Sequence, residues 1–141
     1  MEFRKIGQIY VVRLEIGEEI ITQLKELCTQ LQIGAGKVCG IGVVRSAVIS
    51  YFDLPSGEYR HRKLSGNMEI TSLMGNISFM EGEPYPHLHV VLADKDFQLL
   101  GGHLTAGEIG VTGELIVEPF AEIIERKINQ ESGLNLLVLE G

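Results

Sequence analysis

The chain has 141 residues, with a hydrophobic content of 45% and a charged content of 22%, which predicts one ordinary globular domain over residues 1–141. Its formal net charge is −7, from 12 basic and 19 acidic residues. Affinity for duplex DNA comes largely from lysine and arginine side chains that neutralise phosphates, so this composition argues against a chain that binds DNA by itself. We interpret the one locally basic segment, residues 60–63 (RHRK), as a solvated strand face.

The cysteines and the apolar runs predict a cytoplasmic protein with no membrane partner. Cys28 and Cys39 lack C-x-x-C spacing and sit in apolar neighbourhoods, which is typical of small buried side chains in a reducing compartment. The first residues carry charges within their apolar pattern and no small-residue cleavage site, so we expect no signal peptide. No apolar run approaches the roughly 18 residues of a membrane span.

The first half of the chain predicts a strand followed by the main helix. Residues 9–14 (IYVVRL) have the β-branched and aromatic content of a strand. Residues 18–32 place their apolar side chains on one stripe, which predicts a helix of about four turns. Glu18 and Glu19 fall in its first turn, where the helix dipole favours anions. Gly34 is expected to end it.

The rest of the chain predicts strands, and hence an α+β fold with a bent, largely antiparallel sheet. Gly40 and Gly42 indicate a bulge or a closely approaching neighbour, and Gly75 is expected to break a long strand. Residues 119–129 predict a short helical turn. Besides the hairpin described next, the expected strands are residues 37–45, 47–53, 58–64 (polar and near an edge), 68–79, 113–118 and 134–139.

Three of the four histidines, His87, His89 and His103, fall within one predicted β-hairpin. Its strands are expected over residues 88–93 and 97–104. Side chains alternate across a strand with period two, so His87 and His89 share a face.

The turn of this hairpin, expected at residues 94–96, decides whether His103 joins that face. A two-residue turn at 95–96 would place His103 on the opposite face. The three rings therefore meet only if the turn has an odd number of residues or if a bulge intervenes. Gly101 and Gly102 suit a bulge, because glycine accepts a positive φ.

Three imidazoles on one face predict a metal site at His87, His89 and His103. Zinc binds imidazole nitrogen at about 2.0–2.1 Å, and three histidines leave the open position of a catalytic or ligand-accepting site. No cysteine lies nearby, so the ligands must be nitrogen and oxygen atoms. The alternative is that these histidines only form hydrogen bonds to carboxylate or carbonyl groups on a half-buried strand.

Seven segments, taken in their order and spacing, resemble one known family, the plant-and-prokaryote conserved (PPC) domain, from about residue 5 to residue 140. They are RLEIGEEI (13–20), GIGVVRSAVISYFD (40–53), EITSLMGNIS (69–78), PHLHVVLADKD (86–96), LGGHL (100–104), TGELIVE (112–118) and ERKINQESGL (125–134).

The resemblance implies a homotrimer of compact subunits in which His87, His89 and His103 bind a metal, with zinc expected. The family carries a DNA-binding label, because plant relatives are nuclear proteins that join this domain to AT-hooks, short Arg-Gly-Arg-Pro segments. This chain has no such segment, so we expect it to bind DNA only weakly if at all. The fold also looks similar to that of acetolactate decarboxylase, which likewise uses three histidines on a metal.

Burial also favours an oligomer. Apolar positions in residues 41–44 and 115–117 exceed what one short helix can cover, and soluble proteins normally protect apolar patches and strand edges. Closed cyclic symmetry would hide them without creating a new edge.

Two classes of function remain open from the sequence. The first is a metal-binding module for binding or assembly, and the alternative is a metal-dependent lyase or related small-molecule enzyme. Arg45, Glu69 and Glu114 are polar residues in apolar strands that could assist such chemistry, although we favour their interpretation as a strand-edge charge pair or a subunit-interface salt bridge. A cavity with a charged side chain beside the open metal position would favour the enzyme, and a sealed or flat site would favour the module.

Overall fold

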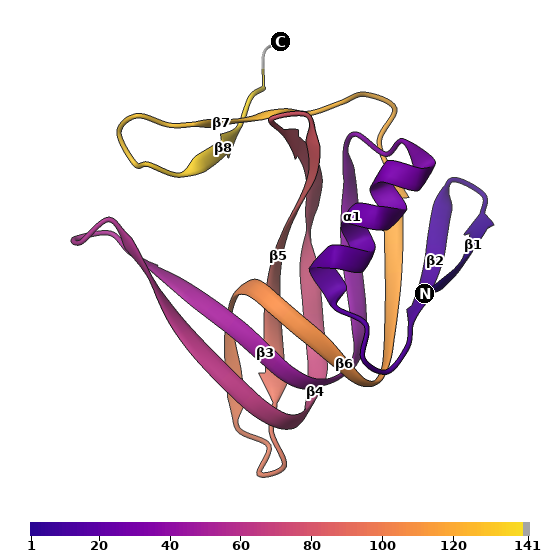
Figure 1. Ribbon diagram of the computed structural model, residues 1–141, viewed down its shortest axis with the longest axis vertical. Coiled ribbons are helices and arrows are strands. Elements are labelled where there is room, and N and C mark those ends of the chain that lie inside the picture. The colour runs from indigo at the N-terminus through magenta and orange to yellow at the C-terminus, as the bar shows by residue number, and fades with distance from the viewer. Residues whose placement is uncertain (140–141) are drawn as a thin grey trace.

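One helix and eight strands make up the part of the chain that the computed structural model describes, residues 1–139 (Figure 1). In chain order they are β1 (Glu2–Ile6), β2 (Ile9–Leu14), α1 (Ile20–Leu31), β3 (Gly36–Asp53), β4 (Glu58–Met80), β5 (Glu83–Ala93), β6 (Leu99–Pro119), β7 (Arg126–Ile128) and β8 (Asn135–Leu137). The fold is mostly antiparallel sheet with one helix, as predicted. The last two residues of the predicted domain, 140 and 141, lie outside the described part.

The main sheet closes on itself through its longest strands. Its order is β1-β2-β6-β3-β4-β5, and β5 pairs in addition with β6. The first part of β6 pairs with β5, from Leu99 to His103, and its last part pairs with β2, from Gly113 to Val117. Because β6 bends between two partners, β5 and β6 lie side by side where the histidines fall. The small sheet β7-β8 projects separately near the C-terminal end (Figure 1).

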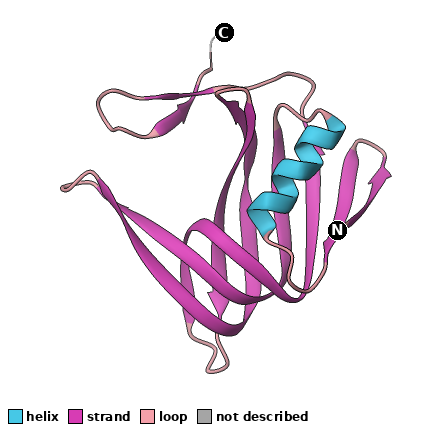
Figure 2. Cartoon of the chain, viewed as in Figure 1, coloured by secondary structure: helices cyan, strands magenta, loops and turns pink. Residues whose placement is uncertain are grey.

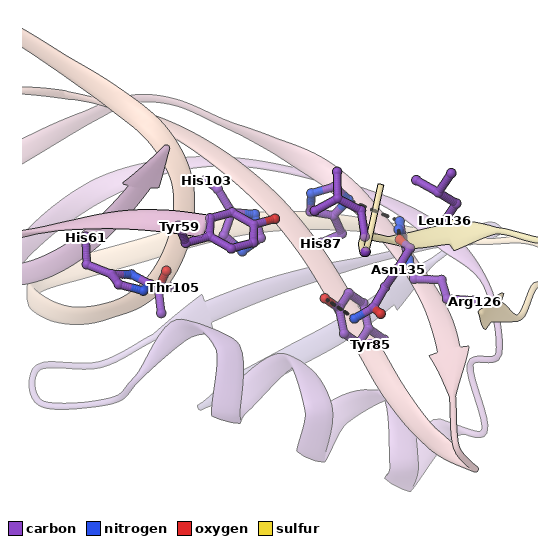
Figure 3. A pocket seen from close by; sticks show the side chains of 11 residues that line it. Tyr59, His61, Tyr85, His87, His103, Thr105, Arg126, Asn135 and Leu136 are labelled. Carbon is purple, nitrogen blue, oxygen red and sulfur yellow. Dashed lines mark hydrogen bonds between the residues drawn. The ribbon is translucent and has the colours of Figure 1, made fainter. Parts of the chain in front are cut away.

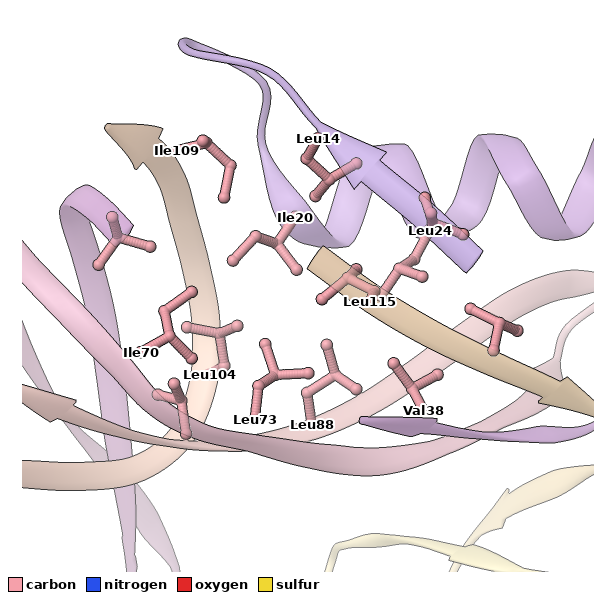
Figure 4. Packing of buried hydrophobic residues seen from close by; sticks show 14 of the residues in the cluster. Leu14, Ile20, Leu24, Val38, Ile70, Leu73, Leu88, Leu104, Ile109 and Leu115 are labelled. Carbon is pink, nitrogen blue, oxygen red and sulfur yellow. The ribbon is translucent and has the colours of Figure 1, made fainter. Parts of the chain in front are cut away.

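The helix α1 covers one face of the sheet with its apolar stripe (Figure 2). Ile20, Leu24 and Leu27 are fully buried on that stripe, and they join core side chains from strands β2 to β6, among them Leu14 and Leu115 (Figure 4). Burying such side chains contributes about 1.5–3 kcal/mol each relative to exposure. Residues 9–14 form a strand as predicted.

The helix boundaries differ from the prediction by one or two residues. Glu19 precedes the helix as its N-cap, and its carboxylate accepts hydrogen bonds from the backbone N–H groups of Ile21 and Thr22. Gln32, with a left-handed φ of 55°, ends the helix, and its N–H contacts the carbonyl groups of Cys28 and Thr29. The expectation that Gly34 ends it is therefore wrong, because the left-handed cap comes two residues earlier.

The glycines of β3 behave as predicted. The register against β4 shifts between Gly40 and Gly42, and a Cβ placed at Gly42, where φ is 150°, would lie 2.2 Å from the carbonyl oxygen of Thr112. These glycines mark a bulge and a close approach of β6. Gly75, in contrast, does not break β4, because it pairs with Val38 on one side and Leu88 on the other.

Several segments predicted separately form single strands. Residues 37–45 and 47–53 join in β3, and residues 58–64 and 68–79 join in β4, because the ladder between β3 and β4 continues through its register shifts. The polar part of β4, residues 58–65, pairs with β3 alone and lies at an edge, as predicted. Strand β6 is continuous, but its register against β3 is irregular near residues 108–113.

Two terminal segments were predicted wrongly. The helical turn expected over residues 119–129 is absent from this described segment, because its backbone bonds to neighbours instead: Phe120 N–H donates to the Ala35 carbonyl at 2.9 Å, and Phe79 N–H donates to the Ile124 carbonyl at 2.8 Å. The segment ends in strand β7. Strand β1 was not predicted, although the pattern Ile-Gly-Gln-Ile at residues 6–9 is the two-residue turn of its hairpin with β2.

Both cysteines are unpaired thiols, as predicted. Cys28 is buried in the core, whereas Cys39 is only half-buried. Within residues 1–139, α1 is too short to cross a bilayer.

Candidate metal centre

The structure brings the three predicted histidines together on one face of the β5–β6 pair. His89 lies directly opposite His103 in the ladder, and His87 lies two residues away on the face that it shares with His89. The ring centroids are 5.4 Å apart for His87 and His89, 5.1 Å for His87 and His103, and 5.7 Å for His89 and His103. One nitrogen from each ring lies within 4.8 Å of the other two.

The loop between the strands, rather than a bulge, produces this register. The ladder ends at the pair Ala93 and Leu99, so the loop has five residues, 94–98, which is the odd number that the histidine geometry requires. The Asp94 carboxylate fixes it by accepting hydrogen bonds of 2.9 Å from the N–H groups of Asp96 and Gln98. The register runs unbroken through Gly101 and Gly102, so the bulge considered there is absent.

The glycine pair instead permits close packing. A Cβ at Gly101 would lie 2.9 Å from the Val90 carbonyl oxygen, and one at Gly102 would lie 2.8 Å from that of Ser50. Larger residues would push β6 away from strands β5 and β3 at the position of His103.

The environment of His87 and His103 favours the uncharged form of these two rings. Burial lowers the pKa of His87 to about 4, and the positive charge of Arg126 acts in the same direction. The pKa of His103 is also lowered, again mainly by burial. A metal ligand must be an unprotonated imidazole, so two of the three rings are in the ligand form at neutral pH without proton release.

Arg126, from β7, contacts the histidine cluster from the side of the small sheet. It is only 6% exposed, and its guanidinium donates to Ser78 Oγ at 2.7 Å, to the Asn135 carbonyl at 2.6 Å and to Asn76 Oδ1 at 2.8 Å. Its Nη2 atom also lies 3.1 Å from His87 Nδ1 (Figure 3). A guanidinium can only donate, so His87 Nδ1 carries the lone pair in this structure and Nε2 carries the proton.

The donor set fits a metal ion after two small adjustments. Tetrahedral zinc with bonds of about 2.0–2.1 Å separates its ligand nitrogens by about 3.3 Å, so the rings, whose donor atoms lie within 4.8 Å of one another, must rotate slightly inward. His87 must also give up its bond from Arg126, because a metal on Nδ1 uses that lone pair and a metal on Nε2 requires a proton on Nδ1. His103 Nδ1 is buried without any partner in the described chain, and a role as metal ligand would resolve this unmet polar group.

A cavity of about 280 Å³ opens beside the histidines (Figure 3). It lies between the main sheet and the small sheet, so that distant segments of the chain share one site. Its walls are polar and aromatic, and they come from β4 (Tyr59, His61), β5 (Tyr85, His87), β6 (His103, Thr105), β7 (Arg126) and residues 133–136.

The polar residues considered for lyase chemistry lie away from this cavity. Arg45 is paired with Glu108, and Glu69 and Glu114 are exposed on other parts of the sheet. Arg45 therefore fits the interpretation as one member of a charge pair between strands. In the basic segment 60–63, Arg60 forms an ion pair with Asp53 at 3.2 Å, but His61 departs from the predicted solvated face, because it lines the cavity and its Nδ1 lies 2.7 Å from Ser50 Oγ.

Sequence reasoning missed Arg126, Tyr59, Tyr85 and Asn135 as site residues. Tyr59 and His61 alternate along one strand, and that period could have indicated a shared face. Arg126 lies within the segment ERKINQESGL, whose resemblance to the family was noted without a role for any residue. No local pattern could have placed it, because it reaches His87 from 39 residues further along the chain.

Comparisons with solved structures agree with this fold. A plant- and prokaryote-conserved protein of Pyrococcus horikoshii is 36% identical, with a TM-score of 0.87 over 99% of this chain and 96% of its own. A metal-containing protein of Archaeoglobus fulgidus is 35% identical, with a TM-score of 0.87 over 98% and 97%. A protein of Bacteroides thetaiotaomicron, described as a candidate DNA-binding protein, is 33% identical, with a TM-score of 0.94 over 97% and 96%.

The comparison with curated proteins gave no match. The model of one family, the Plants and Prokaryotes Conserved domain, matches residues 1–121, which include all three histidines of the cluster. The chain belongs to the Plants and Prokaryotes Conserved domain family, the family that its sequence motifs resemble.

Proposed function

We propose that this chain, as one domain over residues 1–141, is a metal-binding protein that holds one zinc ion per subunit on His87, His89 and His103. The observation that carries the proposal is the convergence of three ligand nitrogens within 4.8 Å of one another. The metal content stated for the Archaeoglobus neighbour, at 35% identity, supports it. Nitrogen-only ligands with an open position suit zinc.

Metal analysis of the purified protein by mass spectrometry tests this proposal. The wild type should contain about one zinc ion per chain, and His89→Ala should lose most of it, because two imidazoles bind zinc far more weakly than three. The matched control is His61→Ala, which removes the fourth histidine, outside the cluster. Full zinc content in His89→Ala, or equal loss in both variants, would contradict the assignment.

We also propose a homotrimer. The face of the sheet away from α1 carries a shallow groove lined by Val11, Ile41 and Met74, of which Ile41 and Met74 are 57% and 56% exposed. Apolar patches of this kind are normally covered in soluble proteins. Multi-angle light scattering at micromolar concentration should give about three times 15.6 kDa. A monodisperse monomer would refute this assembly.

For DNA, we propose that the chain alone binds weakly or not at all, despite the family label. The net charge of −7 opposes the phosphate contacts that dominate such binding. Fluorescence anisotropy with a duplex oligonucleotide at about 150 mM salt should give no submicromolar Kd. Submicromolar binding with a steep salt dependence would show that this charge argument is wrong.

A second candidate function is a metal-dependent lyase or related small-molecule enzyme resembling acetolactate decarboxylase. It is favoured by one observation: the cavity beside the histidines contains a buried charged side chain, Arg126. A zinc ion with an open position would supply a Lewis acid that polarises a substrate carbonyl, while Arg126 and Tyr85 would orient the substrate. Turnover of a panel of small keto acids by the zinc-loaded protein tests this candidate. Absence of turnover across the panel would leave only the binding role.

A further inference from the structure

Arg126 is a buried cation without a countercharge. Its side chain is 94% buried, because only 6% of the residue is exposed, and no carboxylate within residues 1–139 lies in salt-bridge range of it. A guanidinium stays protonated even when burial lowers its pKa. A buried charge normally requires a partner of opposite charge.

A purely structural role explains only part of this arrangement. The bonds to Ser78 and Asn76 connect the small sheet to β4, and the bond to the Asn135 carbonyl connects β7 to β8. Neutral donors could supply such bonds without burying a charge. The structural role explains neither the contact with His87 nor the position of the guanidinium in the wall of a cavity.

The hydrogen bonds of the guanidinium leave donors free for a ligand. Its five N–H groups make four contacts: one from Nε, one from Nη1 and two from Nη2. One Nη1 donor is therefore unused. When a metal binds His87 through either ring nitrogen, Nδ1 can no longer accept, and one Nη2 donor is released as well. Arg126 then has one free N–H on Nη1 and one on Nη2. A carboxylate or phosphate group can accept both of them, one on each of two oxygens, in bidentate pairing.

The cavity sets the size of such a ligand. Its volume of about 280 Å³ lies just below the range for small-molecule pockets, roughly 300–1,000 Å³, so the ligand must be small. The hydroxyl group of Tyr85, which accepts a 3.4 Å bond from Asn135 Nδ2, retains its own proton as a further donor. The Arg126 guanidinium also lies 5.2 Å from the Tyr85 ring centre, which holds these two donors together.

We propose that Arg126 and Tyr85 form, with the open metal position, a binding site for a small oxyanion, a carboxylate or phosphate group on a molecule of metabolite size. The anion supplies the missing countercharge to Arg126 and lies between the guanidinium and the metal. The contact between the anion and the metal rests on the proposed zinc site. The contacts from Arg126 and Tyr85 do not depend on it.

Isothermal titration calorimetry on zinc-loaded and EDTA-treated protein tests the site. The probes are pyruvate, inorganic phosphate and methyl pyruvate, which keeps the keto group but has no charge. We expect the zinc-loaded wild type to bind pyruvate or phosphate, whichever oxyanion the cavity prefers, and to bind methyl pyruvate at least tenfold more weakly. Arg126→Gln should weaken oxyanion binding by about 10-fold to 100-fold, the usual effect of losing charge-assisted hydrogen bonds.

Lys127→Gln is the matched control, because it makes the same charge change at the exposed neighbouring residue. It should leave oxyanion affinity unchanged. Should Arg126→Gln fail to fold, Tyr85→Phe keeps the ring and should weaken oxyanion binding by about 2-fold to 10-fold.

The outcomes separate this inference from the proposed function. Zinc at one ion per chain without oxyanion binding, or with equal affinity in wild type and Arg126→Gln, overturns the oxyanion site and leaves the metal site standing. Oxyanion binding that depends on Arg126 in protein that takes up no zinc supports the oxyanion site and removes the metal. Equal affinity for pyruvate and methyl pyruvate overturns the role of charge.

Discussion

Replacement of Gly75 by alanine should both destabilise the fold and disturb the histidine cluster. A Cβ at Gly75 would lie 2.0 Å from the backbone oxygen of His87 and 2.8 Å from Leu88 Cδ2, whereas real Cβ atoms essentially never approach closer than 3.0 Å. The β5 backbone must therefore retreat by about 1 Å at His87. Such overpacking costs about 1–3 kcal/mol, and the reduced entropy of the unfolded chain offsets only about 0.4–1 kcal/mol of it. The free energy of unfolding should fall by about 2 kcal/mol.

Urea denaturation measures this change. With a slope of about 2 kcal/mol per molar, the midpoint should fall by about 1 M, and the zinc content should fall with it because the displaced atom belongs to a ligand residue. Gly107→Ala is the control, since its nearest obstacle is the end of the Ile20 side chain at 3.1 Å, which can rotate away. If Gly75→Ala unfolds at the wild-type midpoint with full zinc content, the close approach of β5 to β4 at this position is wrong.

Three further outcomes are expected. The pKa of His87 in the folded protein is about 4, below its ordinary value of about 6.5, so between these pH values the unfolded chain binds more protons than the folded one. The urea midpoint of EDTA-treated protein should therefore fall as the pH is lowered from about 6.5 to about 4. The fall should be smaller in His87→Asn, which lacks the titrating ring. Burial raises the pKa of the Cys28 thiol to about 12. In a Cys39→Ser protein, where Cys28 is the remaining thiol, Ellman's reagent at pH 8 should therefore label nothing until the protein is unfolded. Rapid labelling of the native protein would contradict this. Leu24→Ala should lower the free energy of unfolding by about 2–5 kcal/mol in urea titration, because Leu24 is buried in the core. Lys25→Ala, at an exposed position of the same helix, should leave it nearly unchanged.

The histidine cluster could be predicted because its determinants are local. Alternation along β5 fixes His87 and His89 on one face, and the number of residues in the loop decides the face of His103. The sequence did not determine that number, since residues 94–96 resemble a complete turn. The five-residue loop depends on the Asp94 carboxylate, which bonds to two backbone N–H groups beyond it.

Strand lengths could not be predicted, because the same glycines that suggest breaks permit close packing. Gly75 lies between β3 and β5 in a continuous ladder, and its missing side chain is the space that the His87 carbonyl occupies. In a sheet that closes on itself, such positions are set by the neighbouring strand, and a neighbour distant in sequence leaves no local signal.

The family model matches residues 1–121, so its match includes the three histidines and most of the core but not Arg126 or Asn135. A histidine cluster by itself would fit a structural metal or an assembly module equally well. The guanidinium changes this balance, because its structural hydrogen bonds do not require a charge, yet a charged group is buried there in contact with His87 and in the wall of a cavity. The small sheet β7-β8, which supplies Arg126, therefore provides the evidence that this site takes a ligand.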